Sequence, residues 1–276
     1  MINERRYYDY HSIFTEQKFD GINIISVGSE MCIHLFPNSD SLKKILLICK
    51  EKGKIAKCVF PRIDAFSVSK MDEIMEILID ANQDIQVVIN DWGCLQYSRD
   101  FSGKIEFYLG RQLTRSIVDC PWYESVIEGE DDDIKRDLLQ IPFYFQEKLN
   151  MLHEYGISGF ELNSIKDVEE SISVLSRLGW KISVHLNEYL LTCGKNCISQ
   201  RILKSECDCG LCMEKIYLNP IQKWKNLLDT KEQFTEYEKK LLFKMYARGK
   251  AVYLPQTLSE EKLLCNKDIT NIIETV

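Results

Sequence analysis

Five of the 11 cysteines in this chain fall between residues 193 and 212, in the stretch CGKNCISQRILKSECDCGLC. Thiols this close together form disulfides, bind zinc, or hold an iron–sulfur cluster, and the cellular compartment helps to decide between these uses. The N-terminal stretch MINERRYYDYHSIF has no apolar signal-peptide core, and no run of 18 apolar residues occurs. We therefore expect a cytoplasmic protein without a membrane span, where structural disulfides are rare.

The cysteine spacing is informative about the metal. Only one C-x-x-C pair is present, Cys209 with Cys212, preceded by Cys207 and by Cys197 ten residues before that. Structural zinc sites usually pair two such knuckles or add histidines, and no histidine lies near this run. Uneven spacing suits an iron–sulfur cluster, whose frame accepts ligands from a loop and a distant residue. Zinc, and a chance cluster without metal, remain the alternatives.

The elements that would position these thiols alternate between apolar strands and amphipathic helices. Strands are predicted at 21–28, 55–62, 85–91, 105–113, 157–163 and 180–187, with helices at 39–53, 69–82 and 164–179. Residues 138–156 resemble a strand-to-helix passage broken at Pro142, and residues 250–255 resemble a further strand. The pattern predicts parallel strands and a TIM-barrel-like (β/α) barrel, incomplete or decorated, in one domain over 1–276. Its cysteine-rich loop spans 193–212, and a helical extension is expected from about 223 to 276.

The functional residues of such barrels lie at the C-terminal ends of the strands and in the loops that follow them. The strand ends supply a lone thiol, Cys32, and four polar candidates: Asp91, Arg111, Glu161 and His185. We assign Asp91 and Arg111 as catalytic candidates. Asp91 could act as a general base, and the planar guanidinium group of Arg111 could bind a carboxylate or a phosphate. Glu161 and His185 are substrate-binding candidates. Each has a structural alternative: a helix N-cap for Asp91, an ion pair for Arg111, an interior network for Glu161, a core histidine for His185.

Several function classes are disfavoured. The net charge of −7 and the pI near 5.3 speak against nucleic acid as the main partner. The G-x-S-x-G signature of many serine hydrolases and the glycine-rich loop of phosphate-binding sites are both missing from the sequence.

Three motifs together resemble the collagenase-like peptidase family U-32. They are VINDWGCLQ at 88–96, FYLGRQLT at 107–114 and CGKNCIS at 193–199, in the family's order. The resemblance implies a TIM-barrel-like core. It also implies, as in several members that are not peptidases, a [4Fe–4S] cluster used in oxygen-independent hydroxylation. In ubiquinone-biosynthesis members a cysteine after the first strand is a ligand, and GSEMC at 28–32 places Cys32 there.

The ligand set implied by this resemblance is Cys32, Cys197, Cys209 and Cys212, with Cys207 as an alternative to Cys209. The chain differs from the family in two ways. Its cysteine-bearing loop is about two residues shorter, and the glutamate that the family has on the preceding strand is replaced near Ile182. We expect an iron–sulfur protein, a hydroxylase subunit rather than a peptidase. We expect it to act, by hydroxylation or electron transfer, on a small or prenylated aromatic substrate, in a hetero-complex with a related family member. The alternatives are a peptidase-like or peptide-binding module with a structural metal such as zinc, and an RNA-base hydroxylase.

Overall fold

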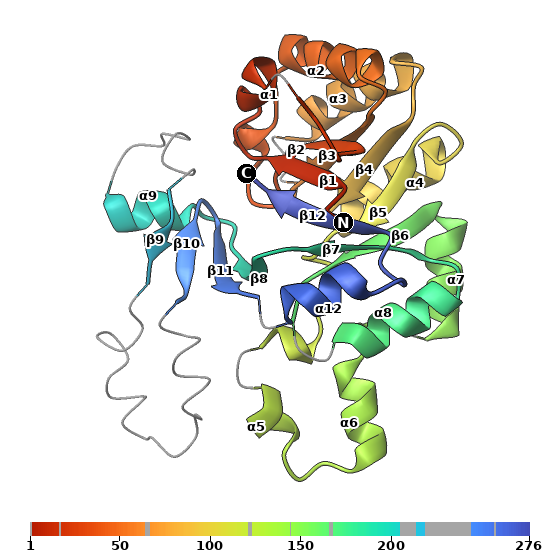
Figure 1. Ribbon diagram of the computed structural model, residues 1–276, viewed down its shortest axis with the longest axis vertical. Coiled ribbons are helices and arrows are strands. Elements are labelled where there is room, and N and C mark those ends of the chain that lie inside the picture. The colour runs from red at the N-terminus through yellow and green to blue at the C-terminus, as the bar shows by residue number, and fades with distance from the viewer. Residues whose placement is uncertain are drawn as a thin grey trace.

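Eight parallel strands close into a barrel in the computed structural model (Figure 1). The structure describes residues 2–16, 18–63, 67–120, 123–143, 145–165, 168–204, 214–218, 244–256 and 258–276. Around the barrel the strand order is β1-β12-β7-β6-β5-β4-β3-β2, with β1 paired to both β12 and β2. The strands are β1 (Glu4–Tyr7), β2 (Ile24–Gly28), β3 (Ile55–Phe60), β4 (Ile85–Ile89), β5 (Glu106–Leu109), β6 (Ile157–Leu162), β7 (Lys181–His185) and β12 (Asn271–Thr275). The predicted TIM-barrel-like fold is confirmed.

Helices between the strands cover the outside of the barrel. α2 begins where the Asn38 side chain accepts a hydrogen bond from the Ser41 amide, at 2.9 Å, and its apolar side packs on the strands. The larger helices are α2 (Ser39–Glu51), α3 (Val68–Asp80), α4 (Leu95–Phe101), α6 (Asp132–Leu139), α7 (Gln146–Glu154) and α8 (Val168–Arg177). Shorter ones are α1 (Ser12–Thr15), η1 (Ile33–Leu35), η2 (Trp92–Cys94), η3 (Ile117–Asp119), α5 (Tyr123–Ile127), α9 (Ile198–Leu203) and α12 (Glu260–Cys265).

A second, antiparallel sheet decorates the barrel, beside which it lies in Figure 1. Its strand order is β8-β11-β10-β9, built from β8 (Glu188–Cys193), β9 (Ile216–Tyr217), β10 (Tyr246–Arg248) and β11 (Ala251–Pro255). β8 follows directly after barrel strand β7. The small sheet therefore begins at the C-terminal ends of the barrel strands, where function is expected.

Two strands and part of the C-terminal region differ from the sequence-based prediction. β1 was not predicted because its inward residues, Glu4 and Arg6, are charged and break the apolar pattern. β12 was not predicted either, and the extension expected to be helical supplies β10 and this last barrel strand, as well as β11, where a strand was predicted. No strand forms within 138–143 or 145–156, where α6 ends and α7 follows. Residues 219–243, which include the first part of the expected helical extension, lie outside the described part.

None of the helices described is both long enough and apolar enough to cross a membrane.

Candidate functional site

The loop after β2 is positioned by a tight turn at Gly28. Its φ of +86° is a left-handed conformation, and a Cβ at this position would lie 2.5 Å from the carbonyl oxygen of Val59. Only glycine fits both constraints. The turn directs Glu30 and Cys32 onto the C-terminal rim of the barrel, where they face the small sheet.

Glu30 is the centre of a buried polar group on this rim. Arg111 Nη2 lies 2.6 Å from Glu30 Oε1, and the hydroxyls of Tyr253 and Tyr8 donate to the same oxygen at 2.9 and 3.1 Å. Burial alone would raise the pKa of Glu30, but the nearby positive charges, led by Arg111, outweigh it and lower the pKa to about 2. Glu30 is therefore an anion at neutral pH, held in place by two phenols and by two cations, Arg111 and, at 3.5 Å, Arg6.

Aromatic rings and cationic groups alternate above this ion pair. Tyr246 stacks on Tyr253 with centroids 5.5 Å apart, and the Arg111 guanidinium lies 5.6 Å from the centre of the Tyr253 ring. Arg248 lies 5.2 Å from the centre of the Tyr8 ring. Such cation–π contacts stabilise a flat arrangement of rings and guanidinium groups. β1, β5, β10 and β11 all contribute to it, so it joins the barrel to the small sheet.

The same region holds most of the unsatisfied polar atoms. In the part of the chain that the structure describes, eight buried side-chain atoms lack a hydrogen-bond partner, and five of them belong here. These are Glu30 Oε2, Arg111 Nε, Glu188 Oε1, Tyr246 OH and Arg248 Nε. Buried polar groups are normally satisfied. Their concentration at one place marks the rim between barrel and small sheet as the candidate functional site.

Three cysteines meet at the edge of this site. Cys32, only 6% exposed, lies in one apolar cluster with Tyr8, Leu190 and Tyr253, and the partly buried Cys193 and Cys197 pack against that cluster. The Cys193 sulfur lies 3.8 Å from the carbonyl oxygen of Glu30, against the segment that carries Cys32. Burial and, next, the charge of Glu30 raise the pKa of the Cys193 thiol to about 12. Cys197 precedes α9, and its sulfur accepts from the Gln200 amide at 3.4 Å.

The predicted metal ligands are thus only partly described. Cys32 and Cys197, far apart in the sequence, reach the same apolar cluster. Cys207, Cys209 and Cys212 lie outside the described residues. Among the residues that are described, no three His, Cys, Asp or Glu side chains are arranged to hold a metal ion. The donor chemistry fits an iron–sulfur cluster or zinc, because both take thiolate ligands.

The barrel interior below the site is charged. Arg6 pairs with both carboxylate oxygens of Glu161, at 2.5 and 3.0 Å, and donates to Glu4 at 3.1 Å. Lys57 lies 2.5 Å from Glu4 and 3.6 Å from Glu161, and His185 Nε2 lies 3.2 Å from Glu161. All five side chains are at most 1% exposed. Glu161 and His185 therefore form the interior network and core histidine that we gave as their structural alternatives.

Arg111 and Asp91 are placed differently. Arg111 makes the buried ion pair with Glu30, and it also donates to Asn163 Oδ1 at 3.2 Å. Asp91 accepts from the amides of Gly93 at 2.8 Å and Ile63 at 3.3 Å, so it caps η2. The structure brings Arg111, Glu161 and His185 into one connected region through Arg6 and Glu30. Among the described residues, Asp91 makes no hydrogen bond or ion pair with that network.

Sequence reasoning missed several residues of the site, namely Glu30, Arg6, Tyr8, Tyr246, Arg248 and Tyr253. Glu30 stands in the quoted GSEMC stretch, and its place two residues after a strand-ending glycine is a usable signal. The tyrosines and Arg248 come from β1, β10 and β11, whose approach to one another depends on the small sheet.

Because His185 is buried, we expect the free energy of unfolding to depend on pH. Burial, then the charge of Arg111, lowers the pKa of His185 to about 3, against about 6.5 for an unfolded chain. Between these values the unfolded state binds a proton that the folded state excludes, so stability falls as pH falls from 6.5 towards 3. We expect His185→Gln to flatten the slope of unfolding free energy between pH 6.5 and 5 by up to about 1.4 kcal/mol per pH unit.

Urea unfolding at several pH values checks this expectation. The exposed His153→Gln serves as the matched control and should leave the slope of the parent protein unchanged. An equal slope in His185→Gln and the parent protein would contradict a neutral buried His185.

Comparisons with known proteins add little to this site. No protein-family model matches the chain, and no curated protein matches it. Among solved structures, one titled "The Structure of the U32 Peptidase Mk0906" is similar, with 10% sequence identity and a TM-score of 0.48. The match covers 100% of this chain and 93% of that one. At this identity and TM-score the similarity establishes neither a family nor an activity.

Proposed function

We propose that this protein is a [4Fe–4S] protein of the peptidase U-32 type, with Cys32, Cys197, Cys209 and Cys212 as ligands. The observation that carries the proposal is that Cys32 lies in an apolar cluster on the rim of the barrel and that Cys197 packs against the same cluster. A (β/α) barrel brings loops from distant strands to one end, and that is how a loop and a remote residue share a cluster. The motifs at 88–96, 107–114 and 193–199 support the proposed family by their resemblance to it, and within that family the chain resembles the ubiquinone-biosynthesis protein UbiV.

A cluster at this position would supply one-electron chemistry. The residues beside it suit a small aromatic substrate bearing oxygen substituents. Tyr246 and Tyr253 offer stacked rings, while Arg111 Nε and Arg248 Nε are donors without a described hydrogen-bond partner. The reaction proposed is oxygen-independent hydroxylation, or electron transfer, on a small or prenylated aromatic compound.

The proposed roles of the polar residues follow from their positions. Arg111 orients the substrate through its guanidinium group, and Asp91 on the neighbouring loop serves as a general base. Glu161 and His185 act one layer deeper, because both are at most 1% exposed. They hold Arg6, and through it Glu30, in a defined position. We further propose a cytoplasmic protein that works in a hetero-complex with a related family member.

Purification under strict exclusion of oxygen tests the proposal. We expect a brown protein with about four iron and four sulfide ions per chain. The Cys197→Ala variant should be colourless and lose most of its iron, because it lacks one ligand.

A colourless parent protein that carries zinc and no sulfide would contradict the iron–sulfur proposal. It would favour the module with a structural metal instead. Cleavage of gelatin by metal-free protein would point further to a peptidase-like activity.

A further inference from the structure

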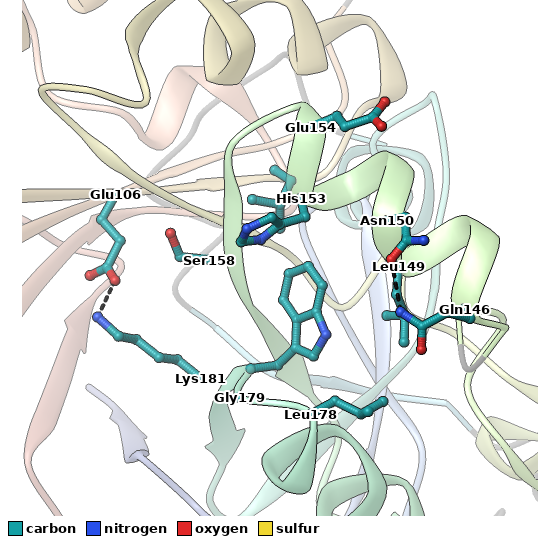
Figure 2. A pocket seen from close by; sticks show the side chains of 12 residues that line it. Glu106, Gln146, Leu149, Asn150, His153, Glu154, Ser158, Leu178, Gly179 and Lys181 are labelled. Atoms are coloured by element: carbon teal, nitrogen blue, oxygen red, sulfur yellow. Dashed lines mark hydrogen bonds and ion pairs between the residues drawn. The ribbon is translucent and has the colours of Figure 1, made fainter.

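A cavity opens at the end of the barrel opposite the candidate functional site. It has a volume of about 640 Å³ and lies between α7 and the turn that joins α8 to β7 (Figure 2). Glu106, Ser158 and Lys181, which line it, stand at or next to the first residues of β5, β6 and β7. The volume falls within the range of small-molecule sites. None of the residues assigned to the candidate functional site lines this cavity.

One wall of the cavity is aromatic and rigid. Trp180 is held from behind by the fully buried Phe160, with ring centroids 4.9 Å apart. His153 stands perpendicular to Trp180, with an interplanar angle of 87° and centroids 5.9 Å apart. Leu178, which is 48% exposed, also lines the cavity and adds apolar surface to it (Figure 2). A flat ring could therefore pack on this wall and remove apolar surface from water.

The electrostatics of the cavity favour a cation. Glu106 and Glu154 line it, and Lys181, which pairs with Glu106, is the cationic side chain among the described lining residues. Helices α7 and α8 both end here, at Glu154 and Arg177, so their C-terminal partial negative charges add to those of the carboxylates. His153 is the remaining titratable group on the wall. The face of Trp180 also attracts positive charge.

We propose that this cavity binds a small flat aromatic cation. Its ring packs on Trp180, and the negative charges of Glu106 and Glu154, which both line the cavity, attract its positive charge. An aromatic anion of the same shape is disfavoured, because the two carboxylates outnumber Lys181 and the two helix C-termini add further negative charge. This site is separate from the proposed iron–sulfur function and does not depend on it.

Calorimetric titration with three probes of matched size tests the proposal: benzamidine as the cation, benzyl alcohol as the neutral analogue and benzoate as the anion. We expect benzamidine to bind with one-to-one stoichiometry and at least about tenfold more tightly than either of the others. Equal affinity for the three probes, or no binding of benzamidine at millimolar concentration, would overturn the proposal.

Two charge variants locate the bound probe. Glu154→Gln should weaken benzamidine binding about three- to fivefold, the usual worth of one exposed charge pair. Lys181→Gln should tighten it by a similar factor, because it leaves Glu106 without its competing cation. Glu147→Gln, an equivalent charge change on α7 outside the cavity lining, should leave the affinity unchanged. An unchanged affinity in both cavity variants would contradict binding at this place.

Trp180→Leu should abolish benzamidine binding. Because Trp180 also packs on Phe160, thermal unfolding of this variant is measured first. If it does not fold, the opposite responses of the two charge variants decide the question.

Discussion

Cys32→Ser is expected to lose the iron–sulfur cluster as completely as Cys197→Ser. The two residues are far apart in the sequence, yet their side chains reach the same apolar cluster on the barrel rim. A serine hydroxyl is a poor substitute for a thiolate, so either change removes a ligand. Iron should fall from about four ions per chain in the parent protein to less than about one in each variant, measured on protein purified without oxygen.

Two other serine variants control this experiment. Cys193→Ser changes a thiol that packs against the same cluster but is not one of the proposed ligands, and Cys265→Ser changes an exposed thiol at the end of α12. Both should keep iron and sulfide at the level of the parent protein. If Cys193→Ser lost its iron while Cys32→Ser kept it, the ligand from the loop after β2 would be wrongly assigned. Circular dichroism of each apoprotein separates ligand loss from misfolding.

Arg6→Met is expected to destabilise the protein by about 3–5 kcal/mol, because it leaves buried carboxylates without their cation. Arg6 is fully buried and pairs with Glu161 and Glu4 inside the barrel. Methionine fills much of the same volume, so the loss of charge rather than a cavity should dominate. Unfolding in urea, followed by circular dichroism, gives the difference in free energy.

The neighbouring residue provides the matched control. Arg5 lies on the same strand with its side chain 27% exposed and pairs with Glu16 and Glu274, so Arg5→Met should cost less than about 1 kcal/mol. The double variant Arg6→Met with Glu161→Gln should recover part of the loss, because it also removes the stranded carboxylate. Equal costs for Arg5→Met and Arg6→Met would contradict a charged barrel interior.

Six of the eight barrel strands could be predicted from the sequence, because their outward residues are apolar and form dense apolar runs between helices. β1 and β12 could not. The sequence of β1, ERRY, alternates charged residues that face inward, and its stability comes from the cations and carboxylates that meet there. Those partners, Lys57 and Glu161, lie on β3 and β6, so the local sequence around β1 cannot predict these ion pairs.

The candidate functional site could also be predicted only in part from the sequence. Residue type and spacing alone indicated that Cys32, Arg111, Glu161 and His185 stand at strand ends on one side of a barrel. Their partners could not be predicted. Whether Arg111 meets Glu30, and whether Tyr8 and Tyr253 donate to that carboxylate, depends on how the small sheet sits on the rim.

The sequence by itself determined the class of fold and the clustering of five cysteines in one stretch, because apolar periodicity and cysteine spacing are local properties of the chain. Only the tertiary structure decided that the barrel interior is ionic and that the rim joins rings, guanidinium groups and thiols. Buried charges are stable only beside opposite charges from other strands, and barrel closure is what brings those strands together.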